Sequence, residues 1–168
     1  MARLFNVIEA SRRCSFSPCR RWRFELEKRW GDGPLIAFIA LNPSTADEHV
    51  DDPTVRRMTG YAKDWEYGGL IVLNLFGWRS PYPEDLRLVE NPVGEGNLSI
   101  EHLTVVRERV EKFVACWGVH GRLLNRGPSV IQRFHALQLP LYCLGTNKGG
   151  EPCHPLYLPK SRKLELFR

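Results

Sequence analysis

The chain has 168 residues, of which 43% are hydrophobic and 26% are charged, as is typical of a soluble globular protein. This length suits one sizeable core, so we expect a single domain over residues 1–168. No apolar run approaches the roughly 18 residues of a membrane span, and the first residues lack the apolar core of a signal peptide. The sequence therefore predicts a cytoplasmic protein with no membrane partner.

The net charge of +5 comes from 24 basic and 19 acidic residues, which is a moderate bias. It permits a polyanionic partner but does not require one. The basic residues gather at Arg12-Arg13, at 20–23 and at 160–163. On charge alone, a solvated surface is the simpler interpretation of these clusters.

The five cysteines do not form a recognisable metal or cluster motif. Cys14 and Cys19 stand five residues apart, and Cys143 and Cys153 stand ten apart. A chain of this length does not need disulfides, and Cys116 and Cys143 lie in apolar runs, where a free thiol usually belongs to the core. We therefore expect no metal and no other cofactor.

Residues 1–34 form an accessory segment ahead of the core. The sequence predicts two strands there, Leu4–Ile8 and Trp22–Leu26, with a turn near Pro18. The alternation along the second strand directs its charged side chains outward, namely Arg21, Arg23 and Glu25. The run 31–34, rich in glycine and proline, then ends the segment.

Residues 35–159 are predicted to form the core, in which buried strands alternate with helices. Four short apolar runs have the composition of strands buried on both faces, at 35–41, 70–76, 113–117 and 139–144. Helices are expected between them: one from Pro53 with Asp52 as N-cap, one near 97–110 and one at about 122–137, in which Gly127-Pro128 is a potential break. This order predicts a three-layer α/β/α fold around a central, mainly parallel sheet of four strands.

Polar residues end two of the predicted strands. Asn42 follows the first apolar run, and Asn74 lies near the end of the second. The carboxyl ends of parallel strands are where open α/β sheets bind ligands. Asn42, taken alone, is explained as a turn residue before Pro43, but two asparagines at neighbouring strand ends need partners. We therefore expect a polar site at this edge.

Four stretches in order resemble the uracil-DNA glycosylase superfamily. They lie at predicted strand ends and span most of residues 35–159: Leu41-Asn42-Pro43, Gly69–Asn74, Phe113–His120 and the loop His154–Leu158. Two motifs, Leu-Asn-Pro-Ser-Thr-Ala-Asp and His-Pro-Leu-Tyr-Leu-Pro, resemble those of an uncharacterised bacterial and phage family more closely. That nearer resemblance implies no substrate.

The resemblance to the superfamily implies a DNA base glycosylase that cleaves the N-glycosidic bond of a damaged or modified base flipped from DNA. Asn42 would position a water, Asn74 would read the base edge, and His154 would donate to the departing base. Leu156 and Tyr157 would wedge into the duplex or contact the sugar. The implied partner is single- or double-stranded DNA, or a nucleotide or base, and the implied role is DNA repair by a hydrolase.

A departure from the superfamily pattern at the catalytic carboxylate calls for another residue in that role. Asn42 stands where the fastest members have an aspartate, and an amide cannot act as a general base. Asp47, Asp51 and Asp52 follow it, and Asp47 is the favoured catalytic carboxylate because it has no evident structural duty. The further substrate-binding candidates are Pro43, Ser44, Thr45, Trp78, Arg79 and His120.

Two other functions remain open on the sequence alone. The missing general base and the basic clusters suit a non-catalytic nucleic-acid-binding module on the same fold. The modest net charge suits an enzyme acting on a free nucleotide or base. For all three functions we expect a monomer.

Overall fold

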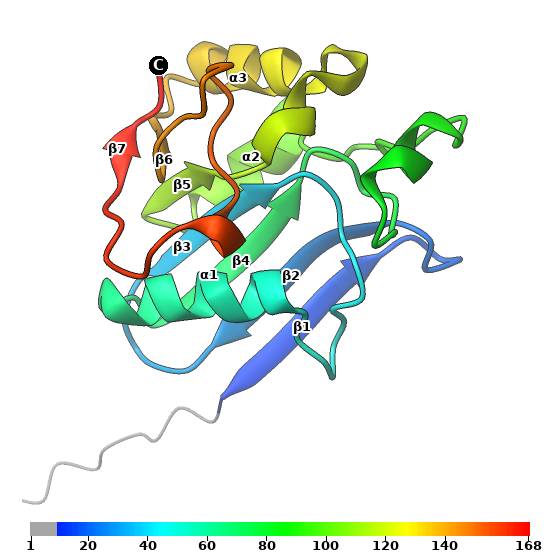
Figure 1. Ribbon diagram of the computed structural model, residues 1–168. Helices are drawn as coiled ribbons and strands as arrows, with labels where there is room; N and C mark the ends of the chain where they lie inside the picture. The colour runs from blue at the N-terminus through cyan, green and yellow to red at the C-terminus, as the bar shows by residue number, and fades with distance from the viewer. Residues whose placement is uncertain (1–9) are drawn as a thin grey trace, which may run out of the picture.

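The computed structural model describes residues 10–168, which form one seven-stranded sheet with helices on both faces (Figure 1). The strand order is β1-β2-β4-β3-β5-β6-β7. The strands are β1 Ser11–Phe16, β2 Arg23–Arg29, β3 Leu35–Ala40, β4 Gly69–Asn74, β5 Lys112–Ala115, β6 Leu141–Cys143 and β7 Glu165–Leu166. The α-helices are α1 Pro53–Asp64, α2 Ile100–Arg107 and α3 Arg126–Ala136, and short 3-10 helices are η1 Pro83–Arg87, η2 Gly118–Asn125 and η3 Pro155–Tyr157.

The α/β class is confirmed, but the predicted four-stranded sheet is wrong. Strands β4, β3, β5 and β6 pair in parallel at the centre of the sheet. Strands β1, β2 and β7 extend it, and each of their pairings is antiparallel. The prediction counted apolar runs buried on both faces, whereas these outer strands are short or rich in charged residues.

Alternate residues of the central strands build two separate cores. Ile36 and Phe38 of β3 face the layer of α1, while Ala37 and Ile39 face the opposite layer. Helix α1 buries Val55, Met58, Tyr61 and Ala62 on the first side, and α2 and α3 bury Leu103, Val106, Val130 and Phe134 on the second. Helices therefore cover both faces of the sheet with apolar side chains. This explains why the sequences of the inner strands are continuous apolar runs.

The helix boundaries follow local signals. Asp52 caps α1 and Pro53 is its first residue, as predicted. Gly127-Pro128 does not interrupt α3, because proline is tolerated in a first turn. The break lies earlier, at Leu124 and Asn125, whose φ angles of 50° and 55° are left-handed.

The accessory segment is a β1–β2 hairpin that turns through the region of Pro18. The predicted strand Leu4–Ile8 lies outside the described residues. The prediction that Arg23 points outward is wrong, since its side chain is only 1% exposed. Arg23 Nη1 donates to the carbonyl oxygen of Ala46 at 2.6 Å, which ties the hairpin to the loop after β3.

Candidate functional site

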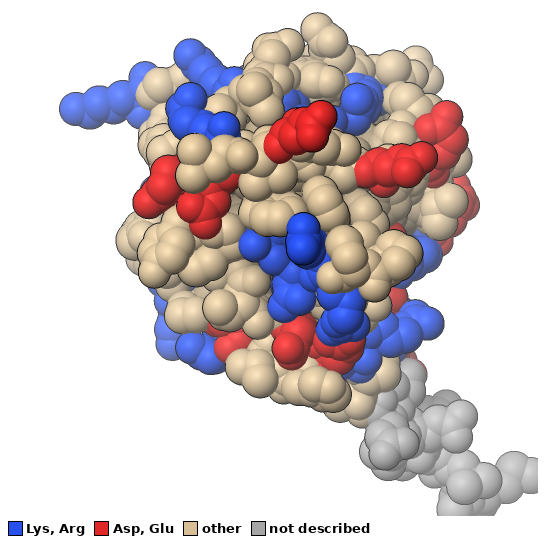
Figure 2. Space-filling model, turned by 90° about the vertical axis from the view of Figure 1, so that its right-hand side faces the viewer, with Lys and Arg blue, Asp and Glu red and all other residues tan. Residues whose placement is uncertain are grey.

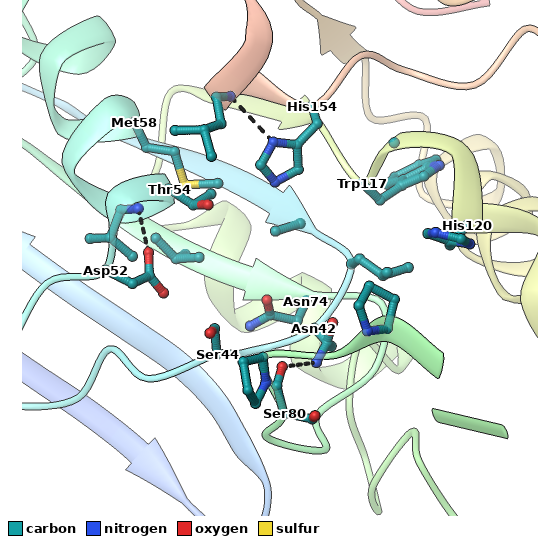
Figure 3. Close-up of a pocket in the computed structure, with 18 of the residues that line it drawn as sticks. Asn42, Ser44, Asp52, Thr54, Met58, Asn74, Ser80, Trp117, His120 and His154 are labelled. Carbon is teal, nitrogen blue, oxygen red and sulfur yellow. Dashed lines mark hydrogen bonds between the residues drawn. The ribbon is translucent and has the colours of Figure 1, made fainter. Parts of the chain in front are cut away.

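A cavity of about 460 Å³ lies at the carboxyl ends of β3, β4 and β5 (Figure 3). The loop after β3, the first turns of α1, the loop before η1, and η2 and η3 close its sides. The polar lining residues are Arg23, Asn42, Ser44, Asp52, Thr54, Asn74, Ser80, His120, His154 and Tyr157. Apolar walls come from residues that include Leu41, Val55, Met58, Val72 and Trp117. The cavity lies at the edge of the sheet where the sequence predicted a polar site.

Asn42 has a fixed amide orientation. Its Nδ2 is within hydrogen-bond distance of three carbonyl oxygens, those of Pro43 at 3.1 Å, Trp78 at 3.3 Å and Ser80 at 2.9 Å. Because all three are acceptors, the NH₂ group must face them. The Oδ1 of Asn42 is left as an acceptor at the cavity, suited to hold a water or a ligand donor.

Asn74 has a buried amide without a partner. The residue is 1% exposed, and neither Nδ2 nor Oδ1 makes a hydrogen bond within residues 10–168. Leaving such a group unpaired costs about 1–3 kcal/mol. Asn74 therefore presents a donor and an acceptor side by side at the wall of the cavity, ready for a ligand with the complementary pair.

His154 is held as a neutral donor. Its Nδ1 accepts a hydrogen bond from the backbone N–H of Leu156 at 3.2 Å. Burial lowers the pKa of His154 below its ordinary value of 6.5, although the nearby Asp52 carboxylate acts in the opposite direction. A neutral imidazole that accepts at Nδ1 carries its proton on Nε2. Figure 3 shows the ring of His154 on a different side of the cavity from Asn74.

Asp52 is the acidic residue of the lining that the sequence interpretation passed over. Its Oδ1 accepts from the backbone N–H of Val55 at 2.8 Å and caps α1. Its Oδ2 makes no hydrogen bond within the described part of the chain. Among the described residues that line the cavity, Asp52 is the only one with a carboxylate. The Asp52-Pro53 pair identified this residue as a helix cap. A cap uses only one carboxylate oxygen, and the sequence does not show that Oδ2 is left without a hydrogen bond.

Seven of the predicted residues line the cavity: Asn42, Ser44, Asn74, His120, His154, Leu156 and Tyr157. Five do not, namely Pro43, Thr45, Asp47, Trp78 and Arg79. Three of these five have contacts elsewhere. Asp47 Oδ1 accepts from the backbone N–H groups of His49 and Val50 in a turn, the Trp78 ring lies 5.0 Å from that of Trp22, and Arg79 lies over Phe16.

Arg23 supplies a cation that sequence reasoning placed on the surface. It lines the cavity, and its Nε is buried without a hydrogen-bond partner in residues 10–168. Burial lowers the pKa of Arg23 to about 10, while Asp52 is among the groups that raise it. The guanidinium therefore remains charged at neutral pH. The cavity combines one buried cation, one carboxylate and two amides, of which that of Asn42 is oriented by hydrogen bonds.

Three further features concern membrane spans, metal sites and cysteines. Over residues 10–168, no helix is long and apolar enough to cross a membrane. Across the same residues, no group of three or more His, Cys, Asp or Glu side chains is arranged to hold a metal ion. All five cysteines are free thiols.

These observations define an α/β protein with a cavity, lined by both polar and apolar side chains, at the carboxyl ends of its parallel strands. The chain belongs to the family DUF1643, a protein family of unknown function, which it matches over residues 23–156. The match runs from β2 to η3 and so includes most of the cavity lining. No curated protein and no solved structure matches the chain. The resemblance to an uncharacterised family is confirmed, whereas nothing in these comparisons links the chain to the uracil-DNA glycosylase superfamily.

Proposed function

We propose that this protein is a DNA base glycosylase that hydrolyses the N-glycosidic bond of a damaged or modified base flipped into the cavity. The observation that carries the proposal is Asn74, whose buried amide has no partner at the wall of the cavity. Nucleobases present adjacent donors and acceptors on their edges. A base edge would therefore satisfy the two polar atoms that the fold leaves unpaired.

The size and walls of the cavity support one nucleoside as its occupant. Its volume of about 460 Å³ lies within the range of small-molecule sites, roughly 300–1,000 Å³. The apolar side chains of Met58, Val72 and Trp117 offer surfaces for the faces of a base. A paired base inside a duplex could not enter such a cavity, so the target nucleotide must leave the stack or come from a single strand.

The lining residues supply the groups that hydrolysis requires. The oxygen of a water attacks C1′ of the sugar while the C1′–N bond breaks and its electron pair goes to the base. Asn42 Oδ1 accepts a hydrogen bond from this water and positions it. Asp52 Oδ2 takes the proton that the water loses, and His154 Nε2–H donates a hydrogen bond to the anionic base. These interactions strengthen as charge develops, which is the requirement for catalysis.

Base release from a panel of oligonucleotides tests the proposal. The panel carries uracil, mismatched, alkylated and hypermodified bases in single- and double-stranded form, and mass spectrometry detects the free base. We expect release by the wild type and a loss of at least about 100-fold in Asp52→Asn and in His154→Asn, as for general acid–base groups. Asparagine can replace either residue as a cap, so both variants should fold.

Asp47→Asn is the matched control, because it removes a carboxylate that does not line the cavity. We expect it to release base at the wild-type rate. Full activity in Asp52→Asn together with loss in Asp47→Asn would move the catalytic carboxylate to Asp47. Absence of release from every substrate would reject the glycosylase proposal. Salt-dependent retention of oligonucleotides would then favour a binding module, and its absence would favour a free nucleotide or base as ligand.

A further inference from the structure

A second concavity, of about 420 Å³, runs along α1 on the other side of η3 from the catalytic cavity. We call it the α1 groove. Three basic residues line it, Arg56, Arg57 and Lys160, with one acidic residue, Asp64. Asp64 lies at the carboxyl end of α1, about 10 Å along the helix axis from the two arginines at about 1.5 Å per residue. The half of the groove nearest η3 is therefore strongly positive.

The three cations of the groove have no carboxylate partners. None of them forms an ion pair within residues 10–168. Arg56 Nη1 donates to the carbonyl oxygen of Asp51 at 2.8 Å, and Arg57 Nη2 donates to that of Leu158. The Nε of Arg57 is buried with no hydrogen-bond partner among the described residues. The groove thus holds unneutralised charge together with an unused donor.

The position of the two arginines in the helix is electrostatically unfavourable. They lie in the first turns of α1, where the helix dipole disfavours cations by about 0.3–1 kcal/mol, and no acidic residue is present in the first turn. The nearest carboxylates are engaged elsewhere. Asp51 pairs with Arg12 and Lys28, and Asp52 caps the helix. An anionic ligand bound beside Arg56 and Arg57 would compensate for their unfavourable interaction with the helix dipole.

The α1 groove and the catalytic cavity share a wall. Leu156 of η3 lines both of them. Tyr61, which lines the groove, donates from its hydroxyl to the carbonyl oxygen of Pro159 at 2.8 Å and so fixes the segment after η3 against α1. The groove and the cavity therefore adjoin each other at Leu156.

We propose that the α1 groove binds the phosphodiester backbone of the nucleic-acid strand next to the nucleotide in the cavity. The inference rests on the proposed function, since it assumes a nucleotide there. A nucleoside in the cavity leaves the phosphates of its strand outside, and Arg56 and Lys160 on the other side of η3 line a groove that can receive one of them. A mononucleotide bound through its own phosphate is the alternative, and the experiment below distinguishes it from a strand.

The basic clusters of the hairpin are less suited to this role. Figure 2 shows a group of basic side chains near the middle of the face that carries the β1–β2 turn, with acidic side chains directly below it. Arg12 pairs with Asp51, Arg13 with Glu27, and Arg20 with Glu48. These cations are already neutralised by the protein, in contrast to those of the groove.

Charge reversal tests the inference. Fluorescence anisotropy would measure the binding of a labelled single-stranded 12-mer to the wild type, to the double variant Arg56→Glu/Lys160→Glu, and to the control Arg107→Glu. Both groove residues and Arg107 are exposed, and Arg107 lies on α2 across the sheet. We expect the double variant to bind at least about tenfold more weakly and its log–log salt slope to fall by about 1.4, or 0.7 per lost phosphate contact. The control should bind as the wild type does.

The outcomes separate this inference from the proposed function. Equal binding by the wild type and the double variant would overturn the proposal that the α1 groove binds a strand, even if base release persists. Equal weakening of binding in the control would overturn it as well. Wild-type protein that binds no 12-mer but releases base from mononucleotides would also overturn it. If the double variant binds the 12-mer more weakly but the wild type releases no base, strand binding in the α1 groove would be supported and the glycosylase activity would be rejected.

Discussion

Asn74 occupies the last position of β4, where both polar atoms of its amide are buried without partners. Leucine has a similar size and no polar atom, so the variant Asn74→Leu removes the cost of an unpaired amide. We expect its free energy of unfolding to equal that of the wild type or to exceed it by up to about 2 kcal/mol. Base release should be lost. Urea unfolding and the release assay measure the two effects.

A structural role for Asn74 would give the opposite result. If Asn74→Leu were destabilised by more than about 1 kcal/mol, the amide would have a partner in the folded protein. Gain of stability with loss of activity is the pattern expected where a site is shaped for a ligand and not for the fold.

His154 gives a pH dependence whose sign follows from its lowered pKa. In the unfolded chain the imidazole titrates near 6.5, and in the folded protein it titrates at a lower pH. The unfolded state therefore binds more protons as the pH falls below 6.5, and the stability associated with the neutral ring is lost as the pH falls through the folded pKa. Protonation also removes the acceptor for the N–H of Leu156.

We therefore expect the wild type to lose stability on acidification relative to His154→Asn, which cannot take up this proton. Denaturant titrations at pH 8 and at steps below 6.5 would show the difference in unfolding free energy shrink or reverse. His135→Asn, which removes an exposed histidine of α3, controls for the loss of a histidine elsewhere. A constant difference between wild type and His154→Asn would contradict the lowered pKa.

At the scale of single elements, the packing of β4 against its neighbours depends on the absence of a side chain at Gly69. A Cβ there would lie 2.4 Å from the carbonyl oxygen of Lys28 and 2.5 Å from a methyl carbon of Leu35. Overpacking of this kind costs about 1–3 kcal/mol. We expect Gly69→Ala to lower the free energy of unfolding by that amount, as measured by urea unfolding.

Gly60 of α1 provides the matched comparison, because nothing lies within 4 Å of a Cβ added there. Alanine is the better residue in a helix interior, so Gly60→Ala should raise stability by about 0.5–1 kcal/mol. If the two variants changed stability in the same direction, close contact at Gly69 would not be what restricts that position.

Local patterns predicted the inner strands and the cap of α1 because each of those signals lies within a few residues. The apolar runs from Leu35 and Leu70 and the Asp52-Pro53 pair were sufficient for this. The outer strands were mostly missed, since β1 and β7 have no buried apolar run. Burial of Arg23 was also missed, because it depends on the loop carbonyl of Ala46, 23 residues away.

The same division applies to the candidate site. Asn42, Asn74 and His154 were predicted from strand ends and one loop motif, and all three line the cavity. Asp52 and Met58 line the cavity only because α1 lies across that edge of the sheet, and a sequence does not place a helix relative to a strand end. Asp47 was predicted to be the catalytic carboxylate because the sequence suggested no structural role for it. In the structure its carboxylate accepts two backbone hydrogen bonds.

At the scale of the whole molecule, occupation of the cavity should stabilise the native state. The cavity is formed by residues that run from Arg23 to Tyr157, so a ligand there connects the hairpin, α1 and the loops at the strand ends. A ligand that binds only the folded chain at 100 times its Kd adds about 2.7 kcal/mol, or about 5–11 °C in Tm for a domain of this size. We expect such a shift from at least one member of a panel of free bases and nucleosides.

Asn74→Leu separates binding in the cavity from binding elsewhere. In this variant the shift should vanish, because the base edge then meets a methyl group in place of a donor and an acceptor. The charge variant Arg56→Glu/Lys160→Glu should keep the shift, since a nucleoside does not reach the α1 groove. An unchanged shift in Asn74→Leu would place the ligand outside the cavity and would remove the main support for base recognition.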